Sequence, residues 1–163
     1  MTEAGIENLA QRAYRIALKE LGVEERAGAD HNPRILEYHQ ATSLKATSDE
    51  VPWCAAFVNW CLLKAGFRDH NGRCGTNSAR ARSFLRFGES VAVHEIQPGD
   101  IVIFAHPSNP AAGHVAFFHA WKNERTGMMS VCGGNQSNRV SIARYSIENL
   151  IGIRRATTNL LQA

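Results

Sequence analysis

The hydrophobic pattern of this chain changes near its middle, from helical spacing to short apolar runs, and this change limits the folds open to it. Helical spacing and helix start and stop signals predict four helices, at 3–21, 33–41, 54–65 and 78–87. Turn residues then separate five apolar segments that predict strands, at 101–105, 114–121, 128–132, 140–145 and 150–154. Helices followed by strands are typical of an α+β fold, so we expect the helices to pack on an antiparallel sheet of about five strands.

The helix at 54–65 has the sharpest limits in the sequence, and a cysteine stands at its start. Pro52 favours an extended approach to the helix, and Gly66 suits the position that ends it. Cys54 therefore lies in the first turn, where free backbone N–H groups and the helix dipole favour a thiolate. The alternative is a small buried apolar residue, the usual role of free cysteine. The position at a helix start favours a nucleophile.

A histidine at the start of a predicted strand is the best candidate for the base that a cysteine nucleophile needs. His114 follows Gly113, which allows close backbone approach, and strand alternation places it on the face opposite His119. The two histidines are therefore not expected to share a metal ion. Asn135, in a Gly-Gly-Asn-Gln segment after the strand at 128–132, offers an amide oxygen that can orient the imidazole. A structural histidine and a simple turn remain the alternatives for His114 and Asn135.

Composition excludes several classes of function. With 163 residues, we expect one domain spanning 1–163. The net charge of +3 comes without a dense Lys/Arg run, so we expect no nucleic-acid partner. The lack of an apolar run of about 18 residues predicts no membrane insertion. Residues 1–22 lack the apolar core of a signal peptide, which predicts synthesis in the cytoplasm without an export signal. A disulfide framework, a metal and a cofactor are not expected, because there is no HExxH motif and no CxxC pair among the four cysteines, at 54, 61, 74 and 132.

Four short segments follow one another in an order that resembles a known enzyme family, at 51–58, 97–104, 113–118 and 131–136. Together they resemble the CHAP/NlpC-type cysteine amidohydrolases and peptidases, a papain-like group that acts on peptidoglycan. The resemblance implies a papain-like fold in which the nucleophile helix packs on the sheet, with Cys54 as nucleophile, His114 as base and Asn135 as the orienting residue. Segments 32–39 and 76–80 resemble an endolysin-like subfamily common in phage and prophage wall-degrading proteins and in some secreted antibacterial effectors.

Two departures from the family pattern affect the expected site. Many CHAP members carry an acidic residue two positions before the asparagine, where this chain has Gly133, so Asn135 is the expected third residue. Some members bind calcium through an acidic loop before the nucleophile, whereas this chain offers only Asp49 and Glu50 there. We therefore expect no metal at the site.

The resemblance implies a peptidoglycan hydrolase with a cysteine–histidine mechanism. The bond cut is either an amide within the stem peptide, as for an endopeptidase, or the sugar–stem amide, as for an N-acetylmuramoyl-L-alanine amidase. Trp53, Tyr38 and Gln136 are the expected substrate-binding residues, with His39 an alternative to Tyr38 and a core role an alternative for Trp53. A zinc-dependent amidase and a non-catalytic wall-binding or inhibitory module remain the rival functions.

The resemblance implies bacterial peptidoglycan as the partner, and a modest positive charge would equally suit an anionic polymer such as a cell wall. We expect a monomer that acts in the periplasm or the cell wall after release or delivery. If the protein is a delivered effector, we also expect an immunity protein as its partner.

Overall fold

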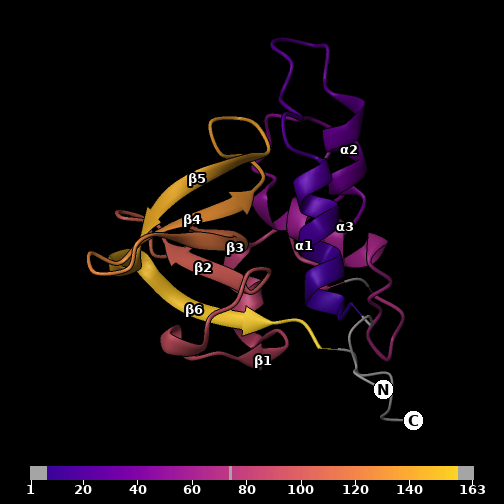
Figure 1. The fold of residues 1–163 in the computed structure, drawn as a ribbon. Coiled ribbons are helices and arrows are strands. Elements are labelled where there is room, and N and C mark those ends of the chain that lie inside the picture. The colour runs from indigo at the N-terminus through magenta and orange to yellow at the C-terminus, as the bar shows by residue number, and fades with distance from the viewer. Residues whose placement is uncertain (1–6, 74, 158–163) are drawn as a thin grey trace.

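The computed structural model describes residues 7–73 and 75–157, which form a layer of helices packed on a curved antiparallel sheet (Figure 1). The helices are α1 (Leu9–Lys19), α2 (Pro33–His39) and α3 (Cys54–Lys64). The strands are β1 (Glu89–Ser90), β2 (Ile101–Ala105), β3 (Gly113–Asn123), β4 (Met128–Gly133), β5 (Ser141–Ser146) and β6 (Leu150–Arg155). Their order in the sheet is β1-β6-β2-β3-β4-β5, with every pair antiparallel. The predicted α+β class is confirmed, and the short β1 adds a sixth strand to the five predicted ones.

Local capping signals set where the helices begin. Asn32 caps α2 by accepting a hydrogen bond from the backbone of the first turn, and Pro33 takes the first helical position. The predicted helix at 3–21 is observed from Leu9, because Asn8 forms a capping box there. Positions 3–6 of that prediction, like Cys74, lie outside the described residues. Within the part of the chain that the structure describes, no helix is long and apolar enough to cross a membrane.

The predicted helix at 78–87 is wrong in type, because the structure has a 3₁₀ helix, η1 (Ala81–Arg86), in its place. The Ser83 hydroxyl donates to the Arg80 carbonyl at 2.6 Å, and the Ser78 hydroxyl accepts from the Arg80 N–H at 3.2 Å. Such local bonds offer the backbone an alternative to the α-helical ladder. Arg80 is therefore extended, with φ −94° and ψ 127°, before the chain turns into η1.

The sheet has an apolar core on each of its two faces. On β3, Val115 and Phe117 pack toward the helices, while Ala116 faces the second core. Phe104 of β2 stacks on Tyr145 of β5 with ring centroids 4.7 Å apart, although β3 and β4 lie between these strands in the sheet order. The sheet therefore curls around the second core, as the curved strands in Figure 1 show.

The alternation predicted for β3 holds up to a bulge after Phe118. His119 lies on the helix side, hydrogen-bonded to Tyr14 of α1, whereas His114 lies on the other face of the strand. The predicted separation of the two histidines is thus confirmed. The register shift after Phe118 then turns Trp121 into the second core, with its ring 5.6 Å from that of Phe118, whereas strict alternation along the strand would place it on the face of His119.

One buried polar residue on α3 fixes the path of the chain beside the helix. The Asn59 side chain is fully buried, accepts a hydrogen bond from the Thr76 N–H at 2.8 Å and donates to the Ser78 carbonyl at 3.0 Å. Gly75 lies so close to Asn59 that a Cβ there would collide with its Oδ1 atom. This network holds the segment at 76–78 against α3, close to the start of the 3₁₀ helix.

Candidate active site

Cys54 lies at the first position of α3, next to the start of β3. The residue is 8% exposed, and the backbone N–H groups of Val115, Ala55 and Cys54 itself lie near enough to the sulfur to act on the pKa of its thiol. The N-cap residue, Trp53, makes no side-chain capping bond, which leaves the first-turn N–H groups to the sulfur. Because Val115 directly follows His114 and packs in the same core as Cys54, the cysteine lies close to the start of the histidine strand.

Burial changes the expected charge state of the cysteine. It raises the pKa of the Cys54 thiol, and the N–H groups of Val115, Ala55 and Cys54 oppose this effect only in part. The position at a helix start alone predicts easier loss of the proton, but in the structure the burial of the sulfur outweighs it. The resting side chain is therefore a neutral thiol that depends on a nearby base.

His114 is half-buried and is held on two sides. Its Nε2 atom is 2.8 Å from Oε1 of Gln136, and its ring lies parallel to that of Tyr145, with centroids 4.9 Å apart and an interplanar angle of 6°. Burial lowers the pKa of the His114 imidazole, and the hydrogen bond with Gln136 acts in the opposite direction. The imidazole is therefore neutral near pH 7, the form in which it can accept a proton.

The surroundings of Gln136 determine which nitrogen of His114 carries the hydrogen. The Gln136 amide nitrogen donates to the carbonyl oxygens of Ser141 at 2.7 Å and Val131 at 3.4 Å, which can only accept hydrogen bonds. Oε1 therefore faces His114 and accepts from its Nε2–H. The other ring nitrogen, Nδ1, is left with a free lone pair, so it is the basic atom of the ring.

The structure gives the orienting position to Gln136 rather than to Asn135. Asn135 has a φ of 58°, a left-handed turn conformation, and among the described residues its side chain makes no hydrogen bond with His114. This turn directs the next side chain, that of Gln136, inward to the imidazole. At Gly133, where many family members carry an acid, a Cβ would lie only 2.7 Å from Gln136 Oε1. The missing acid thus makes room for the glutamine amide.

The other expected substrate-binding residues are core residues in the structure. Trp53 and Tyr38 are both 0% exposed, and their rings stack with centroids 5.7 Å apart. The Trp53 indole donates to Glu25 at 2.8 Å, and the Tyr38 hydroxyl donates to Glu20 at 2.8 Å. His39 is equally buried. These side chains do not reach solvent, so they pack in the core and do not make the substrate contacts that we expected of them. Gln136 is 4% exposed and makes a hydrogen bond with His114.

Tyr145 is the site residue that sequence reasoning missed. It comes from β5 and reaches His114 of β3 only because the sheet curls, which no local pattern in the sequence reveals. It also lies near Cys54, whose negative charge as a thiolate helps to raise the pKa of the Tyr145 hydroxyl, after the larger effect of burial. Tyr145 is therefore part of the wall around the cysteine–histidine pair.

Two hollows lie near the start of α3 or of β3. The first has a volume of about 650 Å³ and is lined by Ser43, Leu44, Val51, Pro52, Ser78, Ala79 and Arg80, so neither Cys54 nor His114 is among the described residues that line it. The second, the His114 hollow, has a volume of about 220 Å³ and is lined by Phe104, Ala105, His106, Pro107, Gly113, His114, Tyr145 and Asn149. Arg82 of η1 also lies beside the start of β3, because its Nε donates to the Ala112 carbonyl at 3.0 Å.

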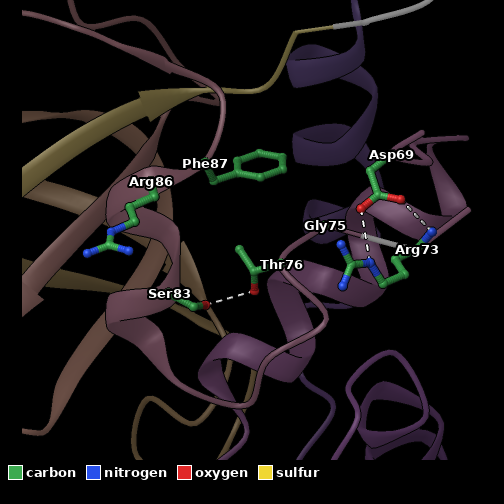
Figure 2. Close-up of a pocket in the computed structure, with 7 residues that line it drawn as sticks. All are labelled: Asp69, Arg73, Gly75, Thr76, Ser83, Arg86 and Phe87. Carbon is green, nitrogen blue, oxygen red and sulfur yellow. Dashed lines mark hydrogen bonds and ion pairs between the residues drawn. The ribbon is translucent and has the colours of Figure 1, made fainter. Parts of the chain in front are cut away.

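A third hollow, of about 280 Å³, lies between the loop at 69–76 and η1 (Figure 2). Asp69 and Arg73 form an ion pair at 3.1 Å on one side, and the Ser83 and Thr76 hydroxyl groups are hydrogen-bonded at 2.8 Å on the other. Figure 2 shows the Arg86 guanidinium pointing away from both pairs. The described residues that line this hollow include neither a cysteine nor a histidine.

Metal-ligating side chains do not gather within residues 7–73 and 75–157, where no three His, Cys, Asp or Glu residues form a potential ion site. Asp49, one of two acids before the nucleophile, accepts hydrogen bonds from Arg26 N–H at 2.8 Å, Asn32 N–H at 2.9 Å and His31 Nδ1 at 3.0 Å. Its oxygens are committed to holding this loop.

Fold and site together define a papain-like cysteine hydrolase architecture. Residues 46–135 match the CHAP domain, so this chain belongs to the CHAP domain family. Membership indicates a family of cysteine hydrolases that act on peptidoglycan. Comparison with curated proteins found no match.

Several solved structures share the fold. NlpC1 from Trichomonas vaginalis is 18% identical, with a TM-score of 0.55 over 96% of this chain and 47% of that one. An NlpC/P60 family protein from Bacillus cereus is 18% identical, with a TM-score of 0.53 over 91% of this chain and 40% of that one. The P60 domain of an antigen from M. avium subspecies paratuberculosis is 11% identical, with a TM-score of 0.55 over 92% and 96%. The chain thus spans about half the length of the first two proteins, and at these identities the likeness concerns the fold.

Proposed function

We propose that this protein is a peptidoglycan hydrolase that cleaves an amide bond with Cys54 as nucleophile and His114 as base. The observation that carries the proposal is the hydrogen bond at 2.8 Å that commits His114 Nε2 to Gln136, at the end of β3 that lies beside Cys54. There the Val115 N–H group, next to His114, helps to lower the pKa of the Cys54 thiol. A thiol and a free basic nitrogen are thereby held at one end of β3, as nucleophilic catalysis needs.

The reaction starts from a neutral pair, since burial raises the pKa of Cys54 and lowers that of His114. His114 Nδ1 takes the thiol proton as the sulfur attacks the amide carbonyl carbon. The backbone N–H of Cys54 stabilises the oxyanion that forms. The protonated Nδ1 then gives its proton to the leaving nitrogen, and the C–N bond breaks to leave a thioester. His114 next removes a proton from water, which attacks the thioester, releases a carboxylic acid and restores the thiol.

Gln136 is the positioning residue in this scheme, in place of Asn135. Its amide is oriented by two carbonyl groups, and its Oε1 holds the imidazole in the tautomer with a basic Nδ1. When the ring becomes an imidazolium, the same oxygen still accepts from Nε2–H. The hydrogen bond therefore persists through the whole cycle.

The bond cut is the stem-peptide amide of an endopeptidase or the sugar–stem amide of an N-acetylmuramoyl-L-alanine amidase. Segments 32–39 and 76–80 support an endolysin-like or effector-like subfamily, as their resemblance implies. In that setting the protein acts as a monomer in the periplasm or cell wall after release or delivery, and an effector would have an immunity partner.

Replacing the nucleophile tests the proposal. Cys54→Ala should abolish the release of new amino groups from purified peptidoglycan, while its thermal unfolding midpoint stays near that of the wild type. Two inhibitors test the rival function of a zinc amidase. A chelator would inhibit such an enzyme, whereas a thiol-alkylating reagent would not. Undiminished release by Cys54→Ala would refute the role of Cys54, and binding to walls without any release by the wild type would indicate a non-catalytic module.

A further inference from the structure

Positive charge is concentrated in one segment of the chain that the proposed mechanism does not use. Residues 68–88 contain five arginines and one aspartate, a net charge of +4 with histidine neutral, while the whole chain carries +3. The remainder of the chain is therefore slightly negative. A charge concentrated in this way produces a local positive potential, which favours an anionic partner at this surface and not elsewhere on the molecule.

Three of the arginines lie on or next to the 3₁₀ helix η1. Arg80 is its N-cap residue, and Arg82 and Arg86 lie within it. None of the three forms an ion pair with a carboxylate of the described residues. The Arg82 Nε donates to the Ala112 carbonyl, whereas the side chains of Arg80 and Arg86 are exposed and make no hydrogen bond with a described residue. We call these three residues the arginine face, and their charges are available to a ligand.

The hollow between the loop at 69–76 and η1 continues this positive surface (Figure 2). Arg73 and Arg86 both line it, against a single acid, Asp69, among the described lining residues. The Asp69 carboxylate already accepts the backbone N–H of Arg73 at 2.8 Å and its Nε at 3.1 Å. Figure 2 shows the Arg86 guanidinium pointing away from this pair. The two positive charges are thus spread along the surface and do not meet at one point.

The arginine face is elongated. A 3₁₀ helix rises about 2.0 Å per residue, so Arg80 and Arg86 are separated by about 12 Å along η1. Arg80 lines the hollow of about 650 Å³ beside the start of α3, and Arg86 lines the hollow of about 280 Å³ at the other end. One small anion can pair with only part of this row. A chain of linked anions can pair with several arginines at once, and each further contact adds to its affinity.

The residue types favour phosphate as the anionic group. All five positively charged residues of segment 68–88 are arginine, and none is lysine. The guanidinium group is planar, always charged and donates two parallel N–H groups to phosphate oxygens. The hydroxyl groups of Thr76 and Ser83 add polar atoms to the lining of the adjoining hollow. A phosphodiester chain, with one permanent negative charge in each repeat, therefore suits this surface.

We infer that the arginine face binds a phosphodiester-linked anionic polymer carried by the bacterial wall. Because Arg80 lies beside the start of α3, the bound polymer holds the enzyme on the wall with the nucleophile helix close to it. The polymer is a second ligand, separate from the amide that is cleaved. The inference rests on the proposed function, since that function supplies the wall as the place of action.

Co-sedimentation with purified walls tests the inference, with Cys54→Ala protein so that digestion does not change the walls. One sample of walls keeps its phosphodiester polymer, and the other is treated with hydrofluoric acid, which cleaves phosphodiester bonds and leaves the peptidoglycan. At about 50 mM salt, where charges are weakly screened, we expect at least five-fold weaker binding to the treated walls. Equal binding to both samples would overturn the inference.

Competition separates a polymer site from a site for a single anion. Long-chain polyphosphate should displace the protein from untreated walls at a phosphate concentration at least ten-fold below that needed with inorganic phosphate. Equal competition by the two would overturn the polymer assignment. Tighter binding to duplex DNA than to untreated walls would overturn the assignment to a wall polymer.

A charge-reversal pair tests the position of the site. Arg86→Glu should weaken binding to untreated walls at least five-fold. The control is Arg125→Glu, at an exposed arginine that follows β3, whereas η1 contacts the residue before the other end of that strand. This control should bind within two-fold of the parent protein. Equal binding by the two variants, whether reduced or not, would overturn the inference.

Amine release distinguishes failure of the inference from failure of the proposed function. With Cys54 intact, both variants should release amines from treated walls at the wild-type rate, and only Arg86→Glu should be slower on untreated walls. An equal loss on both wall samples would place the effect of Arg86 in the catalytic site and overturn the inference. No release by the wild type, with the binding pattern retained, would count against the hydrolase alone. If Arg86→Glu fails to fold, the comparison of treated and untreated walls decides.

Discussion

Two aromatic clusters flank the nucleophile, and they differ in access to solvent. On the helix side, Trp53 and Tyr38 are stacked, 0% exposed, and their polar atoms are bonded to Glu25 and Glu20. On the other face of the sheet, Tyr145 stacks on His114 beside an open hollow. Proximity to Cys54 in the sequence thus says little about contact with substrate. The residue next to the nucleophile packs in the core, while a residue from a distant strand lines the site.

The largest expected effect concerns the contribution of the buried Trp53–Tyr38 pair to the stability of the fold. Trp53→Ala removes a fully buried indole and should lower the free energy of unfolding by about 3–5 kcal/mol, measured by urea denaturation. Ile142→Ala, at a residue that is 41% exposed, serves as the control and should stay within about 0.5 kcal/mol of the wild type. A small loss for Trp53→Ala would contradict the core role of this residue.

The next largest effect, on kcat, distinguishes the role of Gln136 from that of Asn135. Gln136→Ala should lower kcat about ten-fold to a hundred-fold, because it frees a base whose whole contribution is about 10²–10⁴-fold. Asn135→Gly, which keeps the positive φ and removes the amide, should leave kcat within about two-fold, since the Asn135 side chain has no hydrogen bond with His114 among the described residues. Amine release from purified walls measures both. A larger loss of kcat in the Asn135 variant than in the Gln136 variant would assign the orienting role to Asn135.

Changes to the stacked Tyr145–His114 pair should affect catalysis more than stability. Tyr145→Leu removes the ring parallel to His114 and should lower kcat about ten-fold, a part of what the base supplies. Tyr145→Phe keeps the ring and should recover most of that loss. The Leu variant should also move the acidic limb of the kcat profile to higher pH, because added water around His114 reverses the lowering of its pKa by burial. An unchanged profile in Tyr145→Leu would exclude a positioning role.

The smallest expected effect concerns His39, a buried residue of α2 on the helix side of the sheet. This histidine is fully buried, and burial lowers its pKa against the opposing effects of the Ser48 backbone and the Asp49 carboxylate. The unfolded chain binds the proton more readily, so His39 costs stability as pH falls below its unfolded pKa of about 6.5. Unfolding midpoints between pH 7 and pH 5 should therefore fall less in His39→Leu than in the wild type. His94→Leu, at an exposed histidine, is the control, and equal slopes in all three proteins would contradict this assignment.

Local signals predicted much of the fold. Pro52 and Cys54 marked the start of α3, Asn32 and Pro33 that of α2, and the apolar run at 101–105 matches β2. What depends on long-range geometry was not predictable. The curl of the sheet brings Tyr145 to His114, and a bulge reverses Trp121. These follow from how distant strands pair, which hydrophobic period alone does not encode.

The candidate site shows the same limit at the scale of one residue. Cys54 and His114 stood out because each begins an element, and the structure brings their surroundings together through the Val115 N–H. The residue hydrogen-bonded to the imidazole is Gln136, one position after the predicted Asn135, because the positive φ of Asn135 turns the next side chain inward. Amide side chains at adjacent positions look alike in sequence, and only the backbone turn decides which one faces the imidazole.

The pH profile of Cys54 alkylation in the wild type and in His114→Ala is the most direct test of the pairing between thiol and imidazole. With His114 as base, iodoacetamide should modify wild-type Cys54 readily at pH 7, down to the lowered pKa of the imidazole. In His114→Ala the same modification should require a pH above the ordinary value for a thiol, because burial raises the pKa of Cys54. Superimposable profiles from two equally stable proteins would contradict the pairing.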